Sequence, residues 1–321
     1  MVDLQVCPLC KHSTTGARQL HTFKSEVNRT RLQTTLVRCE SCNHVFCDPQ
    51  PTWEEVAPFY GQGTFYEVQN AANRFDFEAV EQLIASRYDD ATKRFNHVPV
   101  HPGGRYLDVG SGGGLMVAAM QRLGMEAEGV EPRADAVAYC RAAGLNVRCG
   151  NLPDAQFPPD TFDCMSLNHV LEHVPDPIDL LIECRRVLKP GGELVVGVPN
   201  YRSLLFQIVG WGWLGIDQPR HLHQFTDETL RLAGEKAGFR VEEMTSESLC
   251  KFVEPELARW LRTKAFVPMT LTLKTRTAYP LASYLTRKGN ATGRGESLVA
   301  HFRKQDAIRD VPSDTRLSPT R

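Results

Sequence analysis

The most informative stretch of this sequence is Leu107-Asp108-Val109-Gly110-Ser111-Gly112-Gly113-Gly114. It continues a short apolar run that begins at Arg105, and it precedes residues 115–123, whose apolar side chains recur at helical spacing. This order predicts a strand, a glycine-rich turn and a helix. Glycine lets a ligand approach the backbone closely, and the first turn of a helix offers unpaired N–H groups, so the turn is a candidate binding site.

Strand and helix patterns continue to alternate after this turn. Strands are expected at 105–109, 127–130, 145–148, 162–167, 193–198, 239–244 and 297–302, and helices at 115–123, 134–143, 178–188 and 226–237. Strands separated by helices of this length are joined by right-handed crossovers and pair in parallel. We therefore predict an α/β fold with a doubly wound, mostly parallel sheet.

The turn lacks the signatures of the common phosphate-binding loops. The dinucleotide fingerprint needs glycine where Leu115 stands, and the Gly-Lys-Ser/Thr of a P-loop is missing. Asp108 precedes the turn, where a carboxylate would repel a pyrophosphate and attract an ammonium group. Glu131 follows the next predicted strand, where a ribose diol would meet it. A ligand with a ribose and an aminoacyl ammonium but no phosphate is S-adenosylmethionine; the alternative is a turn that binds no ligand.

Four of the ten cysteines form two C-x-x-C pairs, Cys7 with Cys10 and Cys39 with Cys42. Two such pairs supply a tetrahedral set of thiolates, and residues 20–37 alternate as a β-hairpin that would bring them together. The N-terminus has no basic and apolar secretion signal, which disfavours disulfides. We expect a structural Zn²⁺ ion; redox-active or incidental cysteines are the alternative.

Residues 105–200 resemble the class I S-adenosylmethionine-dependent methyltransferases. The matching blocks are L-D-V-G-S-G-G-G at 107–114, G-V-E-P at 129–132, F-D-C-M-S-L-N-H-V-L-E-H-V-P-D-P at 162–177 and V-L-K-P-G-G-E-L-V-V-G-V-P-N at 187–200. The cysteine pairs, D-P-Q-P at 48–51 and R-H-L-H-Q-F-T at 220–226 extend the likeness to the bacterial subgroup with an N-terminal zinc ribbon. The resemblance implies a seven-stranded Rossmann-like sheet and a methyltransferase activity.

The resemblance also assigns the cofactor contacts. It implies binding by Asp108, Gly110, Gly112, Glu131, Asn151, Leu152 and Asn168. Asp108 and the two glycines would hold the methionyl tail, and Glu131 the ribose. The family often has Asp at position 151, next to the adenine amine; Asn can accept from that amine and also donate to a ring nitrogen. Asn168 would line the reaction pocket.

Histidines are the candidate general bases, because a hydroxyl acceptor must lose a proton near neutral pH. Among His169, His173, His221 and His223, we expect the catalytic group to be His221, with His223 and His173 as the other candidates. The alternative is that these side chains only form hydrogen bonds within a lid.

A second metal site is not expected. The ubiquinone-type O-methyltransferases, a related branch, bind a divalent cation through E-x-x-E-H. This chain has His169-Val170-Leu171-Glu172-His173, and imidazole is a poor ligand for a hard cation. The substitution argues against Mg²⁺, and the alternative is a helix cap.

Two segments flank the expected acceptor site. The apolar insertion 201–217 is interpreted as a lid packed on the core. The alternatives are an apolar acceptor pocket and peripheral membrane contact through 203–216. Residues 52–97 carry helical periodicity, broken at 61–63, and are expected to close the pocket from the other side. A further helical segment is expected at 254–286.

These patterns divide the chain into a zinc-ribbon module (1–50), a helical linker or cap (51–100), a methyltransferase domain (101–305) and a disordered tail (306–321). The longest apolar stretch is too short to span a bilayer, so a cytoplasmic protein is expected. The sequence carries no signal for the oligomeric state.

The net charge of the chain indicates whether its binding partner is a nucleic acid or a small molecule. The chain has 37 Lys and Arg against 38 Asp and Glu, a net charge of −1, so a nucleic-acid partner is not expected. We expect a small-molecule acceptor, with methyl transfer to a hydroxyl of a sugar, a lipid-linked saccharide or a secondary metabolite. The alternatives are an RNA methyltransferase that uses the ribbon to bind RNA, and a non-catalytic protein that binds the cofactor or a partner.

Overall fold

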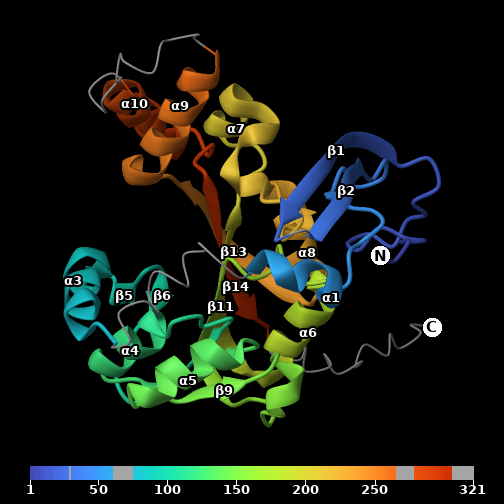
Figure 1. The fold of residues 1–321 in the computed structure, drawn as a ribbon. Helices are drawn as coiled ribbons and strands as arrows, with labels where there is room; N and C mark the ends of the chain where they lie inside the picture. Colours follow the sequence, from blue (N-terminus) through green and yellow to red (C-terminus); the bar gives the residue numbers. More distant parts are fainter. Residues whose placement is uncertain (29, 61–74, 265–277, 306–321) are drawn as a thin grey trace, which may run out of the picture.

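The computed structural model describes residues 1–28, 30–60, 75–264 and 278–305. A seven-stranded sheet lies at its centre, in the order β13-β14-β11-β10-β7-β8-β9 (Figure 1). The strands are β7 (Arg105–Val109), β8 (Glu126–Glu131), β9 (Val147–Cys149), β10 (Phe162–Asn168), β11 (Leu188–Pro199), β13 (Phe239–Glu247) and β14 (Ser297–Lys304). β14 runs antiparallel to both of its neighbours, and the other pairs of this sheet are parallel. The predicted doubly wound α/β sheet is confirmed.

Helices cover both faces of this sheet. The helices α4 (Leu115–Arg122) and α5 (Ala134–Ala142) pack on one face, and α6 (Pro177–Val187) and α8 (Asp227–Lys236) pack on the other (Figure 1). Alternate residues of a strand point to opposite faces: in β7, Tyr106 joins the α4–α5 core and Leu107 joins the α6–α8 core. The first turn of α6 is fixed by Asp176, whose carboxylate accepts from two backbone N–H groups.

The N-terminal module is a β structure that shares a sheet with the rest of the chain. Its strands are β1 (Arg18–Val27), β2 (Thr30–Arg38) and β3 (Val45–Cys47), and β1 and β2 form the predicted hairpin. β12 (His223–Gln224) pairs with β3 and becomes the fourth strand. Cys7, Leu9 and Phe46 are fully buried in the same core as α6 and α8. The N-terminal module is therefore packed directly on the helices that cover one face of the seven-stranded sheet.

The expectation of helix over 52–97 is wrong at its C-terminal end. The helices are α1 (Trp53–Val56), the 3-10 helix η1 (Ala57–Tyr60) and α3 (Phe77–Arg87). They are followed by a small antiparallel sheet of β4 (Tyr88–Asp89), β5 (Arg94–Phe95) and β6 (Val98–Pro99). Positive φ at Lys93, Asn96 and His97 is incompatible with a continuing helix. The expected break at 61–63 lies outside the described residues.

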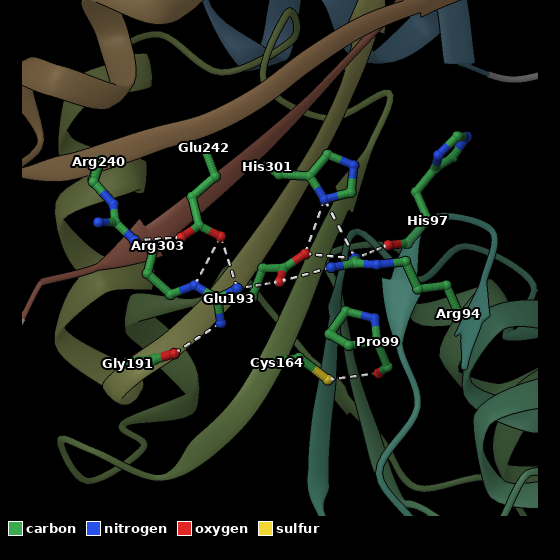
Figure 2. A network of polar contacts seen from close by, with 10 residues as sticks. All are labelled: Arg94, His97, Pro99, Cys164, Gly191, Glu193, Arg240, Glu242, His301 and Arg303. Atoms are coloured by element: carbon green, nitrogen blue, oxygen red, sulfur yellow. Dashed lines mark hydrogen bonds and ion pairs between the residues drawn. The ribbon is translucent and has the colours of Figure 1, made fainter. Parts of the chain in front are cut away.

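A buried ion network anchors this small sheet to the main one. Glu193 of β11 is 2% exposed and receives bonds from Arg94 of β5 at 2.7 Å and Arg303 of β14 at 2.8 Å, and its Oε1 lies 2.9 Å from His301 Nδ1 (Figure 2). Burial alone would raise the pKa of Glu193, but the contacts with His301 and the two arginines hold it at about 2. Through Arg94, which also donates to the carbonyl of His97, the network holds the turn between β5 and β6 against β11.

The C-terminal half adds a helical lobe, at the top of Figure 1. It contains α7 (Leu204–Val209), the 3-10 helices η3 (Gly210–Gly212) and η4 (Leu214–Ile216), α9 (Cys250–Lys264) and α10 (Ala278–Ala291). Helix was expected over 254–286, and two helices are found; 265–277 and the tail 306–321 lie outside the described residues. Trp213 is buried in this lobe, and Trp211 stacks on His21 of β1 at 4.9 Å. None of the described helices is both long and apolar enough to cross a membrane.

Candidate functional site

The glycine turn between β7 and α4 has a backbone that only glycine adopts readily. Gly110, Gly112 and Gly114 have φ of 72°, 51° and 77°. A Cβ on Gly110 would also lie 2.5 Å from Cγ2 of Val170. The amides of Gly110 and Ser111 donate to the carbonyl of Val130 at 2.8 and 3.0 Å, which ties the turn to β8. These contacts hold the turn in one conformation. Because glycine has no side chain, a ligand can approach the backbone of the turn closely.

Asp108 places a buried carboxylate before this turn. It is 4% exposed, and Ser166 Oγ, itself 2.6 Å from the Tyr106 hydroxyl, donates to its Oδ1 at 2.7 Å. Burial raises the pKa of Asp108 to about 7. Among the described residues, the groups that act on the Asp108 carboxyl are the hydroxyls of Ser166 and Tyr106 and the carboxylate of Glu131, and none of them is a cation. A cationic group that entered the turn would satisfy this carboxylate.

Glu131 places a second buried carboxylate on the other side of the turn. Its Oε2 accepts from the amide of Gly112 at 2.9 Å and its Oε1 from the amide of Arg133 at 3.0 Å. Burial raises its pKa. Glu131 is the last residue of β8, so both acids lie at the carboxyl edge of the sheet, where ligands bind in open α/β folds.

The other predicted cofactor residues follow the neighbouring strands along this edge. Asn168 ends β10 and is exposed. Asn151 follows β9, and its backbone and side-chain N–H groups both donate to Asp154 Oδ2. Leu152 is 1% exposed and packs in the core. In the strand order β10-β7-β8-β9, these residues and the glycine turn therefore form one continuous rim.

A small cavity of about 30 Å³ adjoins the rim on the β10 and β11 side. It is lined by Asn96, His97, Met116, Ser166, Asn168, Gly197 and Glu247, among others. His97 Nε2 lies 3.4 Å from Glu247 Oε2, and Arg87 lies 3.9 Å from the same oxygen. Sequence reasoning missed His97 and Glu247. The signal available in the sequence was the polar pair Asn96-His97, which interrupts an otherwise apolar stretch just before Val98-Pro99-Val100.

A cluster of histidines surrounds Glu172 in the loop after β10. Glu172 is fully buried, and its Oε1 lies 3.1 Å from His169 Nδ1, 4.0 Å from His173 Nε2 and 3.9 Å from His221 Nε2. The rings of His173 and His221 meet edge to face at 4.6 Å. Burial raises the pKa of Glu172, but the hydrogen bond to His169 and the nearby imidazoles outweigh it and hold the pKa at about 2. The structure thus joins two of the predicted catalytic histidines to one buried carboxylate.

Backbone carbonyls fix the orientation of these two imidazoles. His173 Nδ1 lies 3.0 Å from the carbonyl oxygen of Arg220, and His221 Nδ1 lies 2.9 Å from that of Gly215. A carbonyl only accepts, which places a hydrogen on each Nδ1. His173 Nδ1 also lies 3.0 Å from the Tyr60 hydroxyl, and His221 Nε2 lies 3.6 Å from Asp217 Oδ2. Burial lowers the pKa of His173 to about 4, which keeps that ring neutral.

His223 has different surroundings. Its side chain is 1% exposed, with Nε2 at 2.9 Å from the carbonyl of Val174 and Nδ1 at 3.1 Å from His44 Nε2. Both nitrogens therefore have partners within the protein, at the junction of β12 with the ribbon. A catalytic role for His223 stays a prediction, and the geometry favours His173 and His221.

The four ribbon cysteines converge as a metal site requires. The sulfur atoms of Cys7 and Cys42 are 3.7 Å apart and those of Cys10 and Cys39 are 3.5 Å apart, and all four lie within 4.8 Å of one another. Around a zinc ion with Zn–S bonds of about 2.3 Å, tetrahedral sulfur atoms are about 3.8 Å apart. The residues fit a structural zinc ion, and four thiolates would leave no coordination position for a substrate.

Comparison with known proteins shows the family of this chain. Residues 78–244 match the sequence profile described as a methyltransferase domain, which is more than half of the chain. The chain belongs to this methyltransferase family. The family segment contains the glycine turn, both buried acids and the Glu172 cluster.

Sequence relatives of this methyltransferase include ubiquinone biosynthesis O-methyltransferases. The enzyme from Xanthomonas campestris pv. campestris (strain B100) is 32% identical over 172 residues, 50% of this chain and 62% of the relative. The enzyme from Hahella chejuensis is 31% identical over 197 residues, 58% of this chain and 71% of the relative. The chain therefore spans about three fifths of the length of the first of these relatives.

A solved structure shares the fold of this methyltransferase. It belongs to the complex between the Haloferax volcanii Trm112 methyltransferase activator and a protein described as a methyltransferase. The TM-score is 0.52 at 17% identity, and the match covers 77% of this chain and all of the other. At this identity the likeness concerns the fold alone.

Proposed function

We propose that this protein transfers the methyl group of S-adenosylmethionine to a hydroxyl of a small molecule, such as a sugar, a lipid-linked saccharide or a secondary metabolite. The observation that carries the proposal is the pair of buried carboxylates, Asp108 and Glu131, on either side of a left-handed glycine turn. Relatives named O-methyltransferases support oxygen as the acceptor atom. The net charge of −1 favours a small molecule over RNA.

The rim residues would hold the cofactor as follows. Asp108 would pair with the ammonium group, Gly110 and Gly112 would allow close approach of the methionyl tail, and Glu131 would receive the ribose hydroxyls. Asn151 and Leu152 would flank the adenine, and Asn168 would line the space beside the sulfur. S-adenosylmethionine, when bound, supplies a methyl group that is already activated on a sulfonium. The protein mainly aligns the acceptor and excludes water.

The Glu172 cluster would receive the acceptor hydroxyl. With S-adenosylmethionine bound, this oxygen would take the methyl group, and the electron pair of the broken carbon–sulfur bond would stay on sulfur. The hydroxyl proton passes to an Nε2 lone pair of His221 or His173. Glu172 would position both rings and stabilise the imidazolium that forms.

The test is S-adenosylhomocysteine binding, measured by calorimetry on the full chain. Asp108→Asn and Glu131→Gln each remove a charge with little change of shape, and each should weaken binding by about 10- to 100-fold, since hydrogen bonds to charged groups contribute about 1.5–3 kcal/mol. Glu126→Gln, at the exposed start of the same strand β8, is the matched control and should bind like the wild type. Unchanged affinity in both site variants would contradict the proposal.

A further inference from the structure

The small cavity beside the rim joins residues of the cofactor site to residues of two other elements. Met116 of α4 and Ser166 and Asn168 of β10 line it from the rim. His97, in the turn between β5 and β6, and Glu247, the last residue of β13, complete its polar lining. A cavity needs about 10–15 Å³ to hold a water molecule, so about 30 Å³ leaves room for one or two groups of hydroxyl size. One polar group of a ligand fits here, and a whole ligand does not.

Glu247 brings a carboxylate with unused acceptor capacity to this cavity. Its side chain is 33% exposed, and its Oε2 lies 3.4 Å from His97 Nε2 and 3.9 Å from Arg87 Nη1. Among the residues that the structure describes, no hydrogen bond reaches its Oε1. A carboxylate can accept about four hydrogen bonds, so Glu247 can accept from a ligand without losing its present partners.

The charges around Glu247 indicate which kind of group it would bind. The hydrogen bond from His97 lowers the pKa of Glu247, burial opposes this, and the charges of Arg87 and His169 lower the pKa further. The ionised carboxylate would repel a phosphate or a carboxylate of a ligand. Arg87 and His169 already balance its charge, so a further cation is not required. A neutral donor such as a hydroxyl fits best.

Two histidines next to Glu247 have strained backbones. The angle φ is 71° at His97 and 56° at His169, in the left-handed region that costs free energy for residues with a side chain. Burial lowers the pKa of His169, but the hydrogen bond to Glu172 and the charges of Glu172 and Glu247 outweigh it and raise the pKa. His169 thus lies between the two carboxylates and connects the cavity to the Glu172 cluster. Strain at two distant positions around one carboxylate is typical of a functional site.

We propose that this cavity binds a second hydroxyl of the acceptor, and that this hydroxyl donates a hydrogen bond to Oε1 of Glu247. The acceptor is then a compound with several hydroxyls on one ring, such as a sugar. Asn168 lines the cavity and would also line the space beside the sulfur, so the bound hydroxyl is a near neighbour of the one that takes the methyl group. The inference rests on the proposed function and narrows its acceptor to polyhydroxyl compounds.

Glu247 is a specificity-determining residue in this assignment, and His97 is a positioning residue. A site built to bind a hydroxyl rejects an analogue that lacks it, because the polar group of the protein then loses its partner. His97 holds the other oxygen of the same carboxylate, and its own carbonyl accepts from Arg94 of the Glu193 network.

Methyl transfer to simple glycosides tests the proposal. The full chain is supplied with S-adenosylmethionine labelled in its methyl group and with the methyl glycosides of glucose, mannose and galactose, each compared with its monodeoxy analogues. We expect at least one glycoside to be methylated. Removal of one hydroxyl other than the methylated one should lower kcat/KM by about 10- to 100-fold, the effect of a hydrogen bond to a charged group.

A variant of Glu247 shows whether this residue reads the second hydroxyl. In Glu247→Ala, the parent glycoside should lose about the same factor, and the deoxy analogue should lose little more, because both changes remove one interaction. Glu243→Ala changes an exposed glutamate of the same strand, β13, and is the matched control that should keep the wild-type discrimination.

Three results would overturn the proposal in a chain that binds S-adenosylhomocysteine: no transfer to any of the glycosides, equal kcat/KM for parent and deoxy analogues in the wild type, or wild-type discrimination in Glu247→Ala. Cofactor binding by the same samples separates this inference from the proposed function. Normal binding with any of these results rejects only the hydroxyl subsite. A wild type that does not bind S-adenosylhomocysteine rejects the proposed function, and the subsite with it.

Discussion

Gly110 shows how one residue position combines backbone and packing constraints. Its φ of 72° is costly for any side chain, and a Cβ would also overlap Val170, two residues before Glu172. The glycine therefore sets both the shape of the turn between β7 and α4 and the position of the loop that carries the histidine cluster.

Gly110→Ala should lower the free energy of unfolding by about 2–4 kcal/mol, because left-handed strain and overpacking add. Gly144→Ala is the matched control, since Gly144 has a φ of 79° with nothing within 4 Å of the added Cβ; it should cost about 1 kcal/mol. Urea denaturation of both variants measures the difference. Equal costs would contradict the packing argument.

Asp108 should make cofactor binding dependent on pH. Its pKa is raised to about 7 by burial, so the carboxyl is charged above that pH and neutral below it. Attraction to an ammonium group is therefore lost as the pH falls, and S-adenosylhomocysteine affinity should drop about tenfold from about pH 8 to about pH 6. Calorimetry measures this, and Asp108→Asn should remove the dependence. A flat profile in the wild type would contradict the assigned role.

At the scale of elements, the apolar insertion is held by two buried carboxyl groups. Glu296, in the loop before β14, accepts from Trp213 Nε1 at 3.0 Å, and Glu256 of α9 accepts from the amide of Leu214 at 3.2 Å. Burial raises the pKa of both groups to about 7, and for Glu256 the nearby Glu296 adds to the effect while Arg259 opposes it. Hydrogen bonds to Glu256 and Glu296, two carboxyl groups that ionise near neutral pH, thus hold the insertion against α9 and the loop before β14.

These groups should make the helical lobe less stable in mild alkali. A carboxyl whose pKa is raised on folding binds more protons in the folded state, so its contribution is full below the unfolded value of about 4.5 and is lost as the pH rises through about 7. The melting temperature should fall by a few degrees from about pH 6 to about pH 8. The double variant Glu256→Gln with Glu296→Gln should flatten this fall, and an unchanged slope in that variant would refute the explanation.

The individual helices and strands differ in how well the sequence predicts them. The elements from β7 to β11 were predicted closely because each carries a local signal, such as the glycines of 110–114 or the Asp176 cap. The small sheet of 88–99 was missed because its strands have two residues each, and no periodicity develops over that length. The pairing of β12 with β3 depends on contacts between distant segments, which no local pattern encodes.

In the candidate site, too, residues with a local sequence signal could be predicted, and contacts between distant segments could not. The positions of Asp108 and Glu131 at the carboxyl edge of the sheet could be predicted because each stands next to a predicted strand end. His97 and Glu247 were missed because they meet only through the turn that the Glu193 network holds in place. The partners of His221 could not be predicted either, since Gly215 and Glu172 reach it through the fold.

For the whole molecule, the ribbon and the catalytic sheet form one packed unit. Phe46 of β3 and Phe225 after β12 are both fully buried in the core that α6 and α8 share. His44 also meets His223 beside the segment that carries His221. A metal ion bound by the four ribbon cysteines would therefore stabilise the catalytic half as well.

Cys39→Ser should remove the ribbon zinc and lower the melting temperature of the whole chain rather than of a separate module, because the shared core is weakened. Ser41→Ala, in the same knuckle but with no metal-ligating side chain, is the control and should keep both zinc and stability. Calorimetric scanning with metal analysis checks this. A catalytic transition at the wild-type temperature in Cys39→Ser would show that the two parts are independent.

A crystal structure of the full chain with S-adenosylhomocysteine tests the central claim most directly. We predict the ammonium group within about 3 Å of the Asp108 carboxylate and the ribose hydroxyls at the same distance from Glu131. The sulfur should face the space between Asn168 and the Glu172 cluster. The account would be contradicted by a ligand bound elsewhere, or by one in the turn whose ammonium and ribose contact neither Asp108 nor Glu131.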